Sequence, residues 1–145
     1  MDVSLREITA DNVRAVCELR VAEDQRKLVA PAAYTIAESA YETGGMLRAI
    51  YLGDKPVGVL WVDGINKDVP YIVRLLVDTD HQRQGIGRQA IEAVISDLQG
   101  RGASAVSVSY VDAPGGAEAF WRACGFEPTG EVRHREQIAR RSLGS

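Results

Sequence analysis

The chain has few of the residues that would tie it to a metal or to an oxidising compartment. Of its 145 residues, two are cysteines, Cys17 and Cys124, and two are histidines, His81 and His134. The cysteines lie far apart and form no CxxC pair, which argues against a structural zinc site. Two free thiols, which we expect to be buried, suit a reducing compartment, so the cytoplasm is the expected location.

Long apolar runs and a strong excess of one charge are also missing. No stretch approaches the roughly 20 apolar residues of a membrane-spanning helix, and the residues after Met1 lack the apolar core of a signal peptide. The formal net charge of -3 gives no general reason for binding to nucleic acid or to an anionic membrane. We therefore expect no metal, no nucleic-acid partner and no membrane partner.

What is present is an ordinary globular composition, with 46% hydrophobic and 26% charged residues. No repeat, low-complexity tract or linker interrupts it, so we expect residues 1–145 to form one domain. Hydrophobic periodicity and turn residues predict an α/β fold in which helices cover a mixed sheet. The predicted strands are residues 3–8, 46–52, 57–62, 71–77, 105–111, 127–133 and 137–143, and the predicted helices are 11–20, 31–42, 85–99 and 117–123.

The loop that follows the fourth predicted strand carries the clearest chemical signal. It leads to Gly85 and Gly87, which open a helix. The first four amides of a helix have no intrahelical acceptor, and the helix dipole adds partial positive charge there. Glycines let a phosphate approach this backbone, and Arg83 and Arg88 add full positive charges. The pattern therefore predicts a site for a pyrophosphate group.

A glycine-rich turn with solvated arginines is the competing interpretation of the same loop. Two common phosphate-binding motifs fit poorly, since the chain has no GxxxxGK[ST] and lacks the third glycine of the dinucleotide fingerprint. The loop also lies in the middle of the chain rather than after the first strand. A protein that binds ATP or NAD through this loop is the weakest alternative.

Two segments resemble the signatures of the GNAT superfamily of N-acetyltransferases. Residues 82–87, QRQGIG, are similar to its acetyl-CoA signature [Q/R]xxGx[G/A], although Thr79 stands where a proline is usual before it. Residues 117–126, AEAFWRACGF, are similar to the second signature, A-x-x-[L/F]-Y-x-x-x-GF. The resemblance covers nearly the whole chain. It implies a mixed, mostly antiparallel sheet with a splayed parallel strand pair and helices on both faces.

The resemblance implies an acetyltransferase with acetyl-CoA as co-substrate. Backbone amides of the loop and of the helix start would hold the pyrophosphate, at Gln82, Arg83, Gln84, Gly85, Gly87 and Arg88. Pantetheine would lie along the splayed strand, with backbone contacts from Leu75 and Val77. An amide near Val77 would steady the thioester oxygen, and such oxyanion stabilisation is often the largest catalytic contribution.

Two positions depart from the superfamily pattern. Pro114 replaces a frequent asparagine that contacts the cofactor, and Trp121 replaces the tyrosine that usually protonates the departing thiolate. An indole N–H donates a hydrogen bond but does not deliver a proton. Because a thiol of pKa about 8.5 leaves fairly well unassisted, acetyl transfer remains the prediction. Trp121 is then either a catalytic residue or a hydrophobic one packed beneath the cofactor.

The acceptor must be a neutral amine, and only about one part in 10³ of an alkylamine is neutral at pH 7. Glu136 is the first candidate to accept its proton, because the late strand pair borders the acceptor cleft in the superfamily. Tyr110 could position a water, and Asp78, Glu131 and His134 are further candidates. The predicted mechanism is direct attack in a ternary complex, since no nucleophile–base pair stands out.

The acceptor itself is only weakly indicated. Residues 28–41, LVAPAAYTIAESAY, are similar to a stretch of bacterial diamine and polyamine acetyltransferases. Residues 11–42 carry six acidic and four basic side chains, an excess that favours a cation, although solvated helix faces look much the same. We therefore expect a small-molecule primary amine, with a polyamine ahead of an aminoglycoside-like drug or a protein amino group. A non-catalytic acetyl-CoA-binding regulatory module, suggested by the two departures, and a homodimer, common in the superfamily, stay open.

Overall fold

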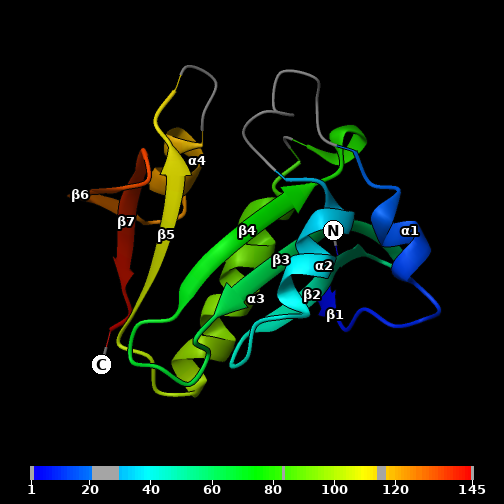
Figure 1. Ribbon diagram of the computed structural model, residues 1–145, viewed down its shortest axis with the longest axis horizontal. Helices are drawn as coiled ribbons and strands as arrows, with labels where there is room; N and C mark the ends of the chain where they lie inside the picture. Colours follow the sequence, from blue (N-terminus) through cyan, green and yellow to red (C-terminus); the bar gives the residue numbers. More distant parts are fainter. Residues whose placement is uncertain (1, 21–29, 83, 114–116, 145) are drawn as a thin grey trace.

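The computed structural model describes residues 2–20, 30–82, 84–113 and 117–144. Its strands form one seven-stranded sheet in the order β1-β2-β3-β4-β5-β7-β6 (Figure 1). The strands are β1 Val3–Arg6, β2 Met46–Leu52, β3 Lys55–Asp63, β4 Tyr71–Val77, β5 Ala105–Val111, β6 Glu127–Arg133 and β7 Glu136–Ser142. The helices are α1 Val13–Cys17, α2 Ala32–Ser39, α3 Ile86–Gly100 and α4 Glu118–Ala123, with a 3₁₀ turn, η2, at Thr79–His81. Neighbouring strands are antiparallel except β4 and β5, which confirms the expected mixed sheet.

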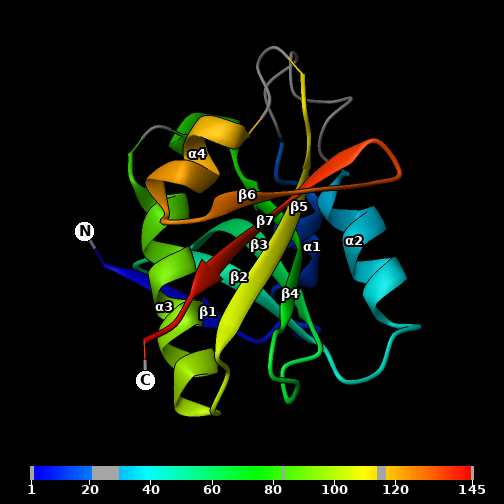
Figure 2. The ribbon, with the colours of Figure 1, turned by 90° about the vertical axis from the view of Figure 1, so that its left-hand side faces the viewer.

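Helices cover both faces of the sheet, α3 and α4 on one and α1 and α2 on the other (Figure 2). The main core lies under α3, whose inward positions Ile86, Ala90, Ile91, Val94, Ile95 and Leu98 are all buried. A smaller core lies under α1 and α2, where Val16 and Ala32 meet Val59 and Leu76 of the sheet. No helix within the described ranges is both long enough and apolar enough to cross a membrane.

The parallel pair β4–β5 is joined only at its beginning. The register links Tyr71 to Ser107 and Ile72 to Val108, and goes no further. Both strands continue beyond these residues, β4 paired with β3 and β5 paired with β7 along their outer sides. In Figure 1 the two strands diverge from their paired end. This opening is the splayed strand pair that the resemblance implied.

The N-terminal part differs most from the sequence-based expectation. The helix predicted over residues 11–20 is the five-residue α1, and Asn12, rather than Asp11, precedes it. The Asn12 side chain accepts from the Thr9 amide and donates to the Tyr51 hydroxyl, so it ties the chain to β2 and does not cap the helix. Cys17, expected to be buried, is exposed. Consecutive helical residues lie about 100° apart, so Cys17 turns outward where its neighbour faces the sheet.

Gly58 on β3 occupies a position where the sheet leaves no room for a side chain. A Cβ there would lie 2.4 Å from the Leu76 carbonyl oxygen and 3.0 Å from the Ile50 side chain. We expect Gly58→Ala to lower the free energy of unfolding by about 2 kcal/mol or more, because backbone must move to admit the methyl group. Gly100→Ala is the control, since a Cβ at Gly100 meets nothing within 4 Å. It should raise that free energy by about 0.5–1 kcal/mol. Equal urea midpoints for the two variants would contradict the packing at Gly58.

Candidate functional site

The loop between β4 and α3 is fixed where it leaves the sheet. The Gln82 side-chain amide donates to the Val77 carbonyl oxygen at 2.9 Å, and the Asp78 amide donates to the Val57 carbonyl oxygen at 2.7 Å. Gly85 then enters α3 with a φ of +78°. This left-handed conformation is one that glycine adopts without steric cost. The first glycine of the motif is therefore required by the path of the backbone itself.

The start of α3 is open to an anionic ligand. Gly85 is the N-cap residue, and a glycine has no side chain that could cap the amides of the first turn. The Gln89 amide donates to the Gly85 carbonyl oxygen, and the amides before it have no acceptor within the helix. Gln84 and Arg88 are exposed beside these amides. The free amides, the helix dipole and the charge of Arg88 can together bind a pyrophosphate. The second predicted arginine, Arg83, lies outside the described residues.

Gly87 is a glycine for a different reason, which is close packing. It is buried, and a Cβ there would lie 3.2 Å from the Phe120 ring of α4. Phe120 meets Trp121 edge to face at a centroid distance of 5.0 Å, and Trp121 meets Phe126 in the same way at 5.3 Å. The second sequence motif thus packs directly on the first. Pro114, the other departure from the superfamily pattern, lies outside the described residues.

Backbone groups of β4 face the opening between β4 and β5. In an antiparallel ladder, alternate residues bond to one neighbour. Because the Asp78 amide donates toward β3, this alternation directs the amides of Leu75 and Val77 toward the opening. The side chains of both residues pack against the main core. An extended ligand that enters the opening would meet two backbone donors on a supported strand.

Three side chains form a hydrogen-bonded row on the α2 face, beside the paired end from which the opening begins. The hydroxyls of Tyr71 and Ser109 are hydrogen-bonded to each other, and Ser109 donates to Oε1 of Glu136 at 3.5 Å. Ser109 directly follows Val108, the last residue of β5 that pairs with β4. We call these three residues the amine-side row. The sequence pointed to Glu136 but not to Ser109 or Tyr71, although serines alternating with apolar residues along β5 mark a face turned away from the core.

Tyr110 and Trp121 lie on the opposite face of the sheet from Glu136. Each is 5% exposed and belongs to the main core. The Tyr110 hydroxyl donates to Oε1 of Glu118 at 3.0 Å. Burial, followed by the hydrogen bond to Glu118 and its charge, raises the pKa of Tyr110. The sheet therefore separates the three residues predicted to be catalytic into two groups.

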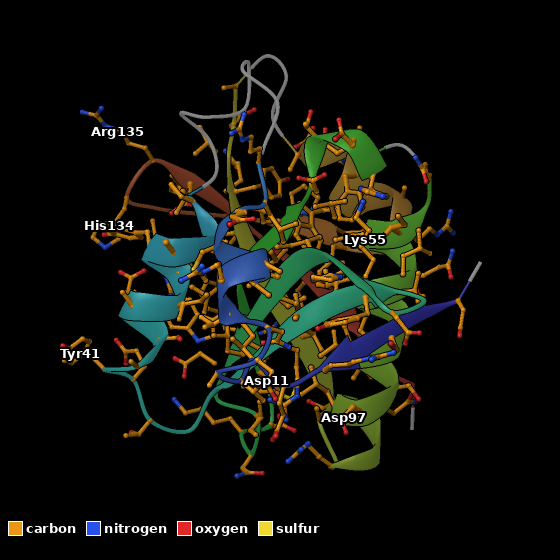
Figure 3. All side chains as sticks on the ribbon, turned by 90° about the vertical axis from the view of Figure 1, so that its right-hand side faces the viewer. Asp11, Tyr41, Lys55, Asp97, His134 and Arg135 are labelled. Carbon is orange, nitrogen blue, oxygen red and sulfur yellow. The ribbon has the colours of Figure 1, made fainter. Side chains whose placement is uncertain are left out.

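The other candidates for the base, Asp78, Glu131 and His134, either make other interactions or point into solvent. The Asp78 carboxylate accepts from the Arg20 amide at 2.9 Å and lies 3.3 Å from Nδ1 of His81. Burial acts to raise the pKa of Asp78, but these hydrogen bonds outweigh it and lower the pKa, which makes a poor base. Glu131 is held in an ion pair within β6 at 2.9 Å. His134 is exposed at the β6–β7 turn with a φ of 48° and projects from its tip (Figure 3).

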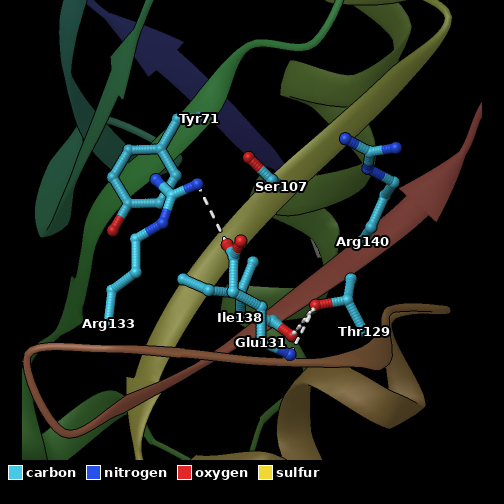
Figure 4. A pocket seen from close by; sticks show the side chains of 7 residues that line it. All are labelled: Tyr71, Ser107, Thr129, Glu131, Arg133, Ile138 and Arg140. Atoms are coloured by element: carbon cyan, nitrogen blue, oxygen red, sulfur yellow. Dashed lines mark hydrogen bonds and ion pairs between the residues drawn. The ribbon is translucent and has the colours of Figure 1, made fainter.

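An open pocket of about 390 Å³ adjoins the amine-side row on the same face (Figure 4). It is lined by Tyr71, Ser107, Thr129, Glu131, Arg133, Ile138 and Arg140. Tyr71 belongs to both the pocket and the row. A ligand group placed at the row therefore has space beside it under the β6–β7 hairpin.

The model of one family, the acetyltransferase (GNAT) family, matches residues 13–126, which include both the loop before α3 and α4. No curated protein matches the chain. A solved domain from Methanocaldococcus jannaschii is similar with a TM-score of 0.80 and 18% identity, over 98% of this chain and 99% of that one. The ribosomal-protein-S18-alanine N-acetyltransferase from Escherichia coli has a TM-score of 0.73 and 17% identity, over 99% and 97%. The PaiA N-acetyltransferase from Thermoplasma acidophilum, solved in complex with coenzyme A, has a TM-score of 0.73 and 11% identity, over 99% of this chain and 100% of that one. At these identities the likeness shows a shared fold.

The two cysteines differ sharply in burial, since Cys17 is exposed and Cys124 is not. Cys124 is buried, and burial raises its pKa to about 11. At pH 8 only about one such thiol in a thousand is ionised, and the thiolate is the reactive form. This argues against Cys124 as a nucleophile.

We expect a thiol reagent at pH 8 to modify one cysteine of the native protein rapidly, and the second only after unfolding. Cys17→Ala should remove the rapid phase because Cys17 is the exposed thiol. Cys124→Ala should leave that phase unchanged. The measurement is the time course of labelling followed by absorbance, and two rapid phases in the native protein would be incompatible with a buried Cys124.

Proposed function

The chain belongs to the GNAT acetyltransferase family, and from that premise we propose that it acetylates a primary amine of a small molecule. Family membership makes it an acetyl-CoA-dependent acetyltransferase; the acceptor and the mechanism are the proposal. One observation carries it. The opening between β4 and β5 has the uncapped start of α3 after the free end of β4 and the amine-side row beside its paired end.

Acetyl-CoA supplies an acetyl group activated as a thioester, and the residues around the opening suit it. The start of α3 offers free amides and the Arg88 charge for the pyrophosphate. The β4 edge offers the amides of Leu75 and Val77 to an extended pantetheine. We assign pyrophosphate binding to the backbone of Gln82, Gln84, Gly85, Gly87 and Arg88 together with Arg83, as the resemblance implied. We assign support of the thioester oxygen to the Val77 amide.

The amine approaches from the α2 face, where Glu136 accepts its proton through the Ser109 hydroxyl. The neutral nitrogen forms a bond to the acetyl carbon, and the bond from that carbon to sulfur breaks. The nitrogen releases its second proton to solvent, and coenzyme A departs as a thiolate that is protonated by solvent. The half-buried position of Glu136 and its hydrogen bond from Ser109 support this assignment. The two substrates react directly, and no enzyme side chain is acetylated.

Tyr110 and Trp121 serve the thiol side of the site in this proposal. Trp121 fills the space between Phe120 and Phe126, and Phe120 supports Gly87 at the start of α3. Tyr110 is engaged with α4 through its hydrogen bond. Tyr110 acts by holding α4 against β5, and Trp121 by supporting Phe120 where it meets α3. The thiolate leaves unassisted, as its pKa of about 8.5 permits.

Diamines and polyamines are the first acceptors suggested by the sequence, through the segment that ends in α2. In the structure, the negative charge of that segment gives less support to a cationic acceptor than the count of its acidic residues suggested. Glu38 on α2 is ion-paired with Arg74 of β4, so its charge is neutralised at the sheet. Part of the segment, residues 28–29, lies outside the described residues. The choice of acceptor must therefore be inferred from the amine-side row and the pocket beside it.

Removing the positive charge at the start of α3 should weaken cofactor binding. We expect Arg88→Gln to raise the Kd of acetyl-CoA about three- to tenfold at low salt, with a smaller effect at high salt because exposed charges are screened. Arg101→Gln removes the same charge at the far end of α3, where Arg101 is paired with Asp97 at 2.9 Å. It should leave the Kd unchanged in the same calorimetric titration. Equal weakening by both variants would indicate a general charge effect and not a pyrophosphate site.

Removing the base should affect turnover and not cofactor binding. We expect Glu136→Gln to lower kcat by about 10²- to 10⁴-fold with the Kd of acetyl-CoA unchanged, because a positioned base contributes on that scale. Glu7→Gln, an exposed carboxylate after β1, and Cys124→Ala should both keep turnover. Release of coenzyme A is the measurement. A Glu136→Gln enzyme with more than half of the wild-type rate would exclude Glu136 as the base.

A further inference from the structure

We infer that the acceptor is an ω-amino acid, whose carboxylate is bound by Arg140 while its amine lies at Ser109. The inference rests on the proposed function, since it names the acceptor of that same site. Two features of the described residues carry it: the charge of the pocket beside the amine-side row, and the spacing between Arg140 and Ser109.

The pocket continues directly from the amine-side row. Tyr71 lines the pocket and is bonded to Ser109 in the row. Ser107 also lines the pocket, two residues before Ser109 and on the same face of β5. An acceptor with its amine at Ser109 therefore extends into the pocket.

The pocket carries one uncompensated positive charge. Arg133 and Arg140 stand at opposite ends of the lining in Figure 4. Arg133 is ion-paired with Glu131 at 2.9 Å. Arg140 makes no side-chain hydrogen bond or ion pair with any described residue, and this includes Glu127, its cross-strand neighbour on β6. The free guanidinium thus faces a pocket that is otherwise rich in hydroxyl groups.

A guanidinium in this position selects between acceptors. A carboxylate can form two parallel charge-assisted hydrogen bonds with it. The distal ammonium group of a diamine or polyamine would meet a like charge there. The pocket therefore favours a zwitterionic acceptor over the polycation that the sequence suggested.

The register of β5 and β7 sets the length of the acceptor. Arg140 pairs with Ser107, so Ser109 is its diagonal neighbour, and such backbones are about 7–8 Å apart. An α-amino acid holds its two charged groups on one carbon and spans much less than this distance, so we expect it to be a poorer acceptor. We propose a chain of roughly four to six carbons, whose length is of the same order as this spacing. Its methylene groups would lie against Ile138, which pairs with Ser109 and lines the pocket.

The chemical step is the one already proposed, and it balances with solvent as the only further participant. The ω-ammonium group gives one proton to Glu136, its nitrogen forms the bond to the acetyl carbon, and the carbon–sulfur bond breaks. The nitrogen then releases its second proton to solvent, and the thiolate takes a proton from solvent. The products are an N-acetyl ω-amino acid and coenzyme A. The carboxylate is unchanged throughout and serves only in recognition.

The test compares kcat/KM for three series of equal chain length: ω-amino acids, α,ω-diamines and simple n-alkylamines. We expect the wild-type enzyme to use ω-amino acids of intermediate length at least tenfold better than the matched diamines. Arg140→Gln should lower kcat/KM for these ω-amino acids about ten- to a hundredfold, the range for a lost bond to a charged group. For n-alkylamines the change should stay within about twofold, because they present no group to Arg140.

Two further variants sharpen the test. Arg135→Gln removes an equal charge from the tip of the same hairpin, where Arg135 is exposed (Figure 3), and should change none of the three series. Arg140→Glu should reverse the preference toward diamines. Equal or better use of diamines by the wild type, or an equal loss for all series in Arg140→Gln, would overturn the inference and leave the proposed function standing. If no amine of any series is acetylated, the proposed function falls with it.

Discussion

The whole site depends on the early end of pairing between β4 and β5. An unpaired backbone edge is normally unfavourable inside a fold, because its amide and carbonyl groups need partners. Here each strand is held by a full ladder on its outer side, β3 for one and β7 for the other. The opening can therefore persist in the folded protein without loss of either strand. Its free backbone groups can in turn be satisfied by an extended ligand.

A sheet joined at only two residue pairs needs other links between its halves, and the helices provide them. Arg141 of β7 donates to Glu92 of α3 at 2.7 Å and to the Cys124 carbonyl oxygen after α4 at 3.0 Å. Gly87 and Phe120 bring α3 and α4 into contact beside the opening. Trp121 belongs to this assembly because two aromatic neighbours surround it. The residue at the usual tyrosine position is thus part of the main core, in edge-to-face contact with the rings on either side of it in the second motif.

Local patterns predicted the elements well and the relations between them poorly. Strands β4, β5 and β6 have the predicted bounds, since apolar runs and turn residues define them along the chain. Gly85 and Gly87 predicted where α3 starts for the same local reason. The row of Tyr71, Ser109 and Glu136 joins three strands, so only the pairing of β4, β5 and β7 reveals it. Hydrophobic periodicity also does not show where the pairing of two strands stops. The divergence of β4 and β5 was therefore expected only from the family resemblance.

The sheet also divides the work of the site between its two faces. On the α3 face Tyr110 and Trp121 are buried in the main core, so a change there disturbs packing. On the α2 face the pocket is formed largely by the β6–β7 hairpin, whose side chains are mostly exposed and whose register shifts between Pro128 and Val132. Exposed residues can be exchanged at little cost in stability. If the acceptor binds as proposed, its choice is set where the fold constrains the sequence least, while both family signatures lie on the other side of the opening.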